Sequence, residues 1–253
     1  MLRAELVYLI YWGKAWTQKD PFVPTAEQVT GAVRTMLAST YMTALAQYRA
    51  IGRGRLRGST LLASSEPPTG FGDDDVDRFV RDQISIGTIP GPDTEDQTLY
   101  AVVMPPGVKP EYEAWDGEHN THGGHGHGIH YAWFASPGAL DGLTAIMSHE
   151  IVETATDPEG SGFLGVRGTC SQEGWCEVAD ICGTTGVIDG VTVSSYWSDE
   201  ARECVVPTTP RLSPGFPRRS GETLRSHNAV VTGPSASALR PAAASSGQGA
   251  RLP

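Results

Sequence analysis

The chain has 253 residues, of which 39% are hydrophobic and 30 are glycine, and its net charge is -10. This composition is typical of a globular protein with many loops. No apolar run approaches the roughly 18 residues that a membrane-spanning helix needs, so we expect no membrane span. The N-terminal residues lack the apolar stretch of a secretory signal peptide.

The charge is unevenly distributed. From Thr208 onward there are 6 Arg and 1 Glu, a balance of +5, so residues 1–207 hold 13 basic and 28 acidic residues, a balance of -15. An acidic body lacks the basic face that phosphate binding requires, so we expect no nucleic-acid partner. The last residues are rich in Ser, Ala, Pro, Gly and Arg, which predicts a disordered tail over 207–253 after one domain at 1–206.

The first half of the chain predicts two strands and two helices. An apolar run rich in β-branched and aromatic residues indicates a buried strand over 6–12. Thr25 is the expected N-cap of a helical segment over 26–49 that breaks near Ser39-Thr40. A turn then leads into a strand over 55–63, and a segment with an acidic first turn predicts a helix over 73–86.

The second half predicts the centre of the fold. Strands are expected over 99–104 and 129–135, separated by a polar, glycine-rich loop over 107–128. A central helix follows over 139–155, and the rest up to residue 207 reads as loops with short strands such as 191–196. The sequence therefore predicts an α/β (α+β) fold, in which a mixed sheet packs against the central helix.

The central helix contains the most informative motif, Ser148-His149-Glu150-Ile151-Val152-Glu153. His149 and Glu153 are four residues apart, so they share a helix face that points away from the apolar stripe and towards a cleft. An imidazole and a carboxylate can hold Zn²⁺, with Glu150 beside them as a general base. The motif differs from the H-E-x-x-H of zinc peptidases in having a glutamate as its second ligand. The alternative is a solvated surface patch.

A catalytic zinc ion usually takes three protein ligands, so a third is expected elsewhere. Glu177 and Asp180 are the candidates, because both lie between two cysteines in a short segment. Asp157, at the helix end, is expected to cap the helix or to hydrogen-bond a ligand. Five of the seven histidines fall within residues 119–130. This cluster is either a mobile surface loop or a contributor to the site through a residue such as His119.

Four cysteines, Cys170, Cys176, Cys182 and Cys204, fall within 35 residues, and none forms a Cys-x-x-Cys pair. This spacing disfavours a structural zinc knuckle. Two disulfides beside the predicted site would suit an oxidising compartment, and four unpaired thiols are the alternative.

The chain resembles the EXORDIUM/phosphate-induced protein family of plants and its bacterial and fungal relatives. The resemblance covers about residues 6–206. It rests on Tyr11-Trp12-Gly13, on the motif from Ser148 to Thr156-Asp157-Pro158, on Glu177-Val178-Ala179-Asp180-Ile181-Cys182, and on Tyr196-Trp197-Ser198 with Cys204. It implies a zincin-like core and a secreted protein. Gly117-Glu118-His119 lies where the family has Cys-Gly-aromatic-His, without the cysteine or the aromatic residue.

These observations lead to two functional expectations. The first is a zinc-dependent hydrolase, most simply of peptide bonds, with metal ligands His149, Glu153 and either Glu177 or Asp180, and with Glu150 as the base. The second is a non-catalytic extracellular protein that binds cell-wall or matrix components and whose metal site is structural. An oxygen-rich site of that kind would also suit Ca²⁺.

Overall fold

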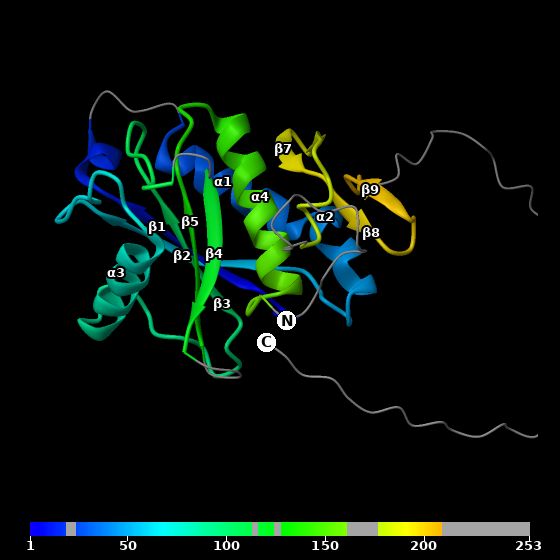
Figure 1. Ribbon diagram of the computed structural model, residues 1–253, viewed down its shortest axis with the longest axis horizontal. Coiled ribbons are helices and arrows are strands. Elements are labelled where there is room, and N and C mark those ends of the chain that lie inside the picture. Colours follow the sequence, from blue (N-terminus) through cyan, green and yellow to red (C-terminus); the bar gives the residue numbers. More distant parts are fainter. Residues whose placement is uncertain (19–23, 113–115, 124–127, 161–176, 209–253) are drawn as a thin grey trace, which may run out of the picture. The chain divides into compact units, whose positions relative to one another are not determined.

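The structure is a computed structural model that describes residues 1–18, 24–112, 116–123, 128–160 and 177–208. Its centre is a five-stranded mixed sheet with the strand order β2-β1-β3-β5-β4 (Figure 1). Neighbouring strands are parallel except β4, which is antiparallel to β5 at one edge. The strands are β1 Leu6–Trp12, β2 Arg55–Leu62, β3 Thr98–Val103, β4 Gly117–His122 and β5 Ile129–Phe134. The predicted α+β class is confirmed.

Helices cover both faces of this sheet, with α3 on one face and α1 and α4 on the other (Figure 1). The helices are α1 Ala26–Ala38, α2 Thr40–Thr43, α3 Asp73–Ser85 and α4 Leu140–Thr156, with short 3₁₀ turns η1 Lys14–Thr17 and η2 Ala44–Gln47. Two hairpins follow α4, formed by β6 Thr185–Ile188 with β7 Val191–Ser194, and by β8 Tyr196–Ser198 with β9 Glu203–Val205. None of the described helices is long and apolar enough to span a membrane.

Residues Met1–Pro210 make up one compact unit. The predicted tail over 207–253 lies outside the described residues except for its first two positions.

Burial on both faces explains why β1 is almost continuously apolar. Val7 and Leu9 lie in the hydrophobic cluster shared with α1 and α4, whereas Ile10 and Trp12 lie in the cluster shared with α3. Trp12 stacks on Phe79 of α3, with the ring centroids 3.7 Å apart. Alternate residues of a strand point to opposite faces, so a strand covered on both sides must be hydrophobic at every position.

The start and the end of α1 follow the prediction. Thr25 is the N-cap, and it forms a capping box in which the Gln28 N–H donates to Thr25 Oγ1 (3.2 Å) and the Thr25 N–H donates to Gln28 Oε1 (2.8 Å). The expected break falls at Ser39, which ends α1 and whose Oγ accepts from the Tyr41 N–H (3.1 Å) to begin α2. A serine side chain that replaces helical hydrogen bonds favours such a boundary.

The edge strand β4 corrects the sequence analysis, which assigned residues 107–128 to a loop. Its sequence Gly-Glu-His-Asn-Thr-His has no apolar residue, so neither composition nor hydrophobic alternation identifies it as a strand. It forms because β5, a buried apolar strand, offers it a complete antiparallel ladder from Gly117 to His122. Polar residues are common on edge strands, where one side of the backbone has no neighbouring strand.

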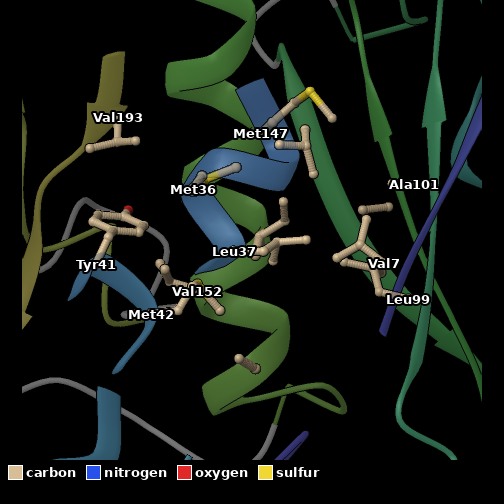
Figure 2. Close-up of a cluster of buried hydrophobic side chains, with 14 of the residues drawn as sticks. Val7, Met36, Leu37, Tyr41, Met42, Leu99, Ala101, Met147, Val152 and Val193 are labelled. Atoms are coloured by element: carbon tan, nitrogen blue, oxygen red, sulfur yellow. The ribbon is translucent and has the colours of Figure 1, made fainter. Parts of the chain in front are cut away.

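The central helix α4 lies between the sheet and β7. Leu143, Met147 and Ile151 of the predicted stripe are fully buried. Figure 2 shows Met147 among side chains of the sheet and Val193 of β7 on the opposite side of the helix. The β7 side is polar as well as apolar, because Ser148 Oγ accepts a 2.7 Å hydrogen bond from the Ser194 N–H. The second half of α4 is therefore buried between the sheet and β7, and it faces solvent at the cleft described next.

Candidate metal centre

One turn of α4 presents His149 and Glu153 side by side, as the spacing predicts. Nε2 of His149 lies 3.2 Å from Oε2 of Glu153 and 3.2 Å from Oδ1 of Asp180. These three residues, which we call the cation site, offer ligand atoms that all lie within 4.8 Å of one another. Asp180 comes from the turn before β6, so the structure brings together residues 31 positions apart in the chain.

The distances between these atoms can be compared with those between the ligand atoms of a zinc ion. In a tetrahedral zinc site with bonds of about 2.0–2.1 Å, two ligand atoms lie about 3.3 Å apart. Both 3.2 Å contacts agree with this spacing, and both involve the same ring nitrogen of His149. Both carboxylates therefore lie beside the nitrogen that would bind the ion, at a distance that also suits a hydrogen bond from a protonated ring. The side chains present fit a divalent cation.

The second oxygen of Glu153 fixes the turn that carries Asp180. Oε1 accepts hydrogen bonds from the backbone N–H groups of Ala179 (3.2 Å) and Asp180 (3.1 Å). The turn closes with a hydrogen bond from the Cys182 N–H to the Ala179 carbonyl (2.8 Å), and Cys182 is disulfide-bonded to Cys204. This pair is one of the two disulfides that the sequence suggested. Cys170 and Cys176 lie outside the described residues.

Glu177, the other candidate for third ligand, lies against a different histidine. Its Oε1 is 3.4 Å from Nε2 of His119 on β4. Nδ1 of the same ring is 3.1 Å from Oε2 of Glu150, and Nε2 is also 3.3 Å from the backbone carbonyl of Asp157. Asp157 is the residue that ends α4, so it contributes its carbonyl oxygen at this point. The structure thus pairs Asp180 with His149, and Glu177 with His119.

The two other described histidines of the cluster, His122 and His130, contact residues outside the cation site. His122 of β4 pairs with Asp77 of α3 at 3.1 Å, and His130 of β5 shares a 2.7 Å hydrogen bond with Thr121. His125 and His127 lie outside the described residues. His119 differs because residues alternate across β4, which turns it towards α4. If residues 117–122 are taken as a strand, His119 and His122 lie on opposite faces of it, which distinguishes His119 from the rest of the cluster.

Several carboxylates surround the rings of His149 and His119, and these groups shift one another's pKa values. Burial would lower the pKa of His149, but the charge of Glu153 and a hydrogen bond with Asp180 outweigh it and raise this pKa to about 11. Burial raises the pKa of Glu153 to about 7, against the opposing charge of His149. For His119, the effect of burial is outweighed by the neighbouring Glu150 and Glu177 carboxylates, which raise its pKa well above the usual value.

All these groups line one cleft of about 830 Å³ between β4, α4 and the Asp180 turn. Its described lining contains no lysine or arginine and holds further acids on β4 and in the segment before it, including Glu118 and Asp116. Burial, followed by the charge of Asp73, raises the pKa of Glu118 to about 7. A cleft with this charge balance favours a bound cation.

Comparison with known proteins finds no matching protein-family model, no matching curated protein and no matching solved structure.

Proposed function

We propose that this protein is a metal-dependent hydrolase that uses zinc and acts on peptide bonds. The observation that supports this most directly is the convergence of Glu153 and Asp180 on one ring nitrogen of His149, at the spacing of zinc ligands. Three protein ligands would leave a position for water, which is the arrangement of catalytic rather than structural zinc sites. The similarity of its motifs to the EXORDIUM family agrees with a zincin-like core.

The residues around the cation site have distinct tasks in this proposal. A zinc ion held there supplies Lewis acidity, which activates water and polarises a carbonyl group. Glu150 lies one residue from His149, and one of its oxygens is within 4.8 Å of a Glu153 oxygen. In this proposal Glu150 accepts the proton of an attacking water and passes it to the leaving nitrogen.

The cleft also suits an extended chain. Strand β4 forms its wall and pairs with β5 alone among the described strands. An edge strand offers backbone N–H and C=O groups to an added strand, and an extended peptide meets that requirement. A peptide bond next to such an edge would lie close to Glu150 and to the cation site.

Metal content and one substitution test the proposal. Purified protein should contain about one zinc ion per chain by elemental analysis, with an anomalous signal at the zinc edge in crystals, and His149→Ala should lose it. Glu150→Gln should keep the zinc and lose hydrolysis of a general protein substrate such as casein. Equal activity in the wild type and in Glu150→Gln would exclude Glu150 as the base.

A second function is favoured by one feature of the site. Two of its three ligand residues are carboxylates, which reduce the Lewis acidity of a bound zinc ion relative to a histidine-rich site. This favours a non-catalytic extracellular protein that binds cell-wall or matrix components and uses the ion for stability. Calcium in the purified protein, together with the absence of hydrolysis, would identify that function, because calcium prefers oxygen ligands.

A further inference from the structure

The two histidines of the cleft meet their carboxylates in different ways. At His149 both acidic partners approach the same nitrogen, Nε2. At His119 they approach opposite ring nitrogens, because Glu150 lies 3.1 Å from Nδ1 and Glu177 lies 3.4 Å from Nε2. A ring nitrogen binds a metal through its single lone pair, so residues that share an ion with it gather around that one atom. His149 has two carboxylates at one nitrogen, whereas His119 has one at each nitrogen, although His119, Glu150 and Glu153 also offer ligand atoms within 4.8 Å of one another.

The surroundings of His119 are those of a hydrogen-bond donor. Its side chain is 6% exposed, and its ring lies among oxygen atoms that accept hydrogen bonds. Nδ1 faces the Glu150 carboxylate, and Nε2 faces the Asp157 carbonyl (3.3 Å) and the Glu177 carboxylate. With the Glu150 and Glu177 carboxyl groups ionised, an N–H at each nitrogen satisfies both sides of the ring. A ring in that state has no lone pair for a metal ion.

His119 also joins three parts of the molecule that the sequence keeps apart. It belongs to the edge strand β4, Glu150 and Asp157 belong to α4 and its C-terminal end, and Glu177 begins the turn that leads to Asp180. Oε1 of Glu177 is buried and has no hydrogen-bond partner in the described part of the chain, so the ring of His119 is its nearest compensating group. Two carboxylates, one buried and one partly buried, thus lie on either side of one ring.

We propose that His119 is a positioning residue, which fixes the Glu150 carboxylate and the Glu177 end of the Asp180 turn and does not bind the metal. The part that concerns Glu150 rests on the proposed function, in which Glu150 is the base. The contact with Oε2 of Glu150 determines which carboxylate oxygen faces the cation site. Misplacing a catalytic group by about 1 Å costs on the order of a hundredfold in rate.

The first experiment needs no substrate. Ring nitrogen chemical shifts of His119 and His149 are measured by NMR in the full chain, first metal-free and then with zinc added. His119 should carry protons on both nitrogens in both states, whereas His149 should lose one when zinc binds. A shift of His119 to a metal-bound nitrogen would overturn the proposal, as would a ring with one proton in the metal-free protein.

The second experiment asks whether His119 acts through Glu150. His119→Phe should keep about one zinc per chain and lower kcat about a hundredfold with KM within about twofold. The same change in the Glu150→Gln background should lower kcat no further, because residues that act as a unit are not additive. His122→Phe, on the same strand but paired with Asp77, is the matched control and should keep its activity.

The results separate the two proposals. Loss of zinc from His119→Phe together with a metal-bound His119 in the NMR spectra would make His119 a ligand. An additive loss in the double variant would overturn its action through Glu150. If the wild-type chain binds zinc and hydrolyses nothing, the proposed function fails, and the ring measurement alone decides whether His119 is a ligand.

Discussion

Glu153 accepts a hydrogen bond from the backbone N–H of Asp180 through one carboxylate oxygen, and its other oxygen faces His149. The helix therefore binds the turn that carries Asp180, the proposed third ligand, and it does so with a residue that is itself a proposed ligand. Assembly of the cation site and folding of the turn depend on the same side chain.

This double role predicts that two ligand substitutions differ in stability. Glu153→Ala and Asp180→Ala should both lose zinc. In chelator-treated protein, Glu153→Ala should also lower the free energy of unfolding by about 1–3 kcal/mol more than Asp180→Ala, because the N–H groups of Ala179 and Asp180 lose their acceptor. Urea unfolding measures both values. Equal stabilities would contradict the anchoring role of Glu153.

Zinc binding should release a proton. The pKa of His149 is raised to about 11 in the metal-free site, so its ring is protonated at neutral pH and must lose a proton to become a ligand. The apparent zinc affinity should therefore rise about tenfold per pH unit between about pH 8 and pH 10, and more steeply below pH 7, where Glu153 must also lose a proton. Titration calorimetry in buffers of different ionisation enthalpy counts the protons. A pH-independent affinity would show that His149 is not the ligand.

Gly117 is expected to be required for the placement of Glu150. A Cβ atom at this position would lie 2.6 Å from Ile146 Cγ2 and 3.2 Å from Glu150 Cγ. Gly117→Ala should cost about 1–3 kcal/mol of stability through overpacking and should reduce hydrolysis by moving Glu150. Gly31→Ala in α1, where nothing lies within 4 Å, is the control and should stabilise the protein by about 0.5–1 kcal/mol. Thermal unfolding compares the two.

Glu5 should make the protein less stable as the pH rises. It is 1% exposed, and neither carboxylate oxygen has a hydrogen-bond partner in the described part of the chain. Burial raises its pKa well above the usual value, and the charge of His119 opposes this only in part. Between the unfolded pKa of about 4.3 and the higher folded pKa, the folded chain binds more protons, so stability falls as pH rises through that interval.

Glu5→Gln removes this titration. It should be more stable than the wild type at pH 7, by at most about 1.4 kcal/mol for each pH unit between about 4.3 and 7, and equal to it near pH 4. Urea unfolding at the two pH values measures the difference, with the exposed residue Glu95 changed to Gln as the control. A Glu5→Gln protein that is no more stable at pH 7 would show that the buried carboxylate is compensated.

The sequence predicted the elements of the central sheet and its helices that carry an apolar or helical pattern, and it missed the polar edge strand β4. Strand β1 and helix α4 have strong apolar patterns, and their bounds agree with prediction to within one residue. Strand β4 has only polar residues, and it depends on pairing with β5, which is 7 or more positions further along the chain. Pairing between strands is a tertiary property, so residue patterns within 117–122 could not reveal it.

The candidate site was likewise predicted in part from the sequence. Helical periodicity placed His149 and Glu153 together, because both belong to one regular element. It could not choose between Glu177 and Asp180, since their directions depend on a turn held by hydrogen bonds with Glu153. The contact of His119 with Glu150 also escaped prediction, because it requires the position and the facing of β4.

The hydrogen bonds of Glu153 explain why an acid is better suited to this position than a second imidazole. A neutral histidine ring has one acceptor nitrogen, so in binding an ion it would have none left for the backbone of the Asp180 turn. A carboxylate has two oxygens and can serve both partners at once. Exchanging Glu153 for histidine would therefore give the H-E-x-x-H motif of zinc peptidases but would remove the acceptor that holds the turn carrying the proposed third ligand.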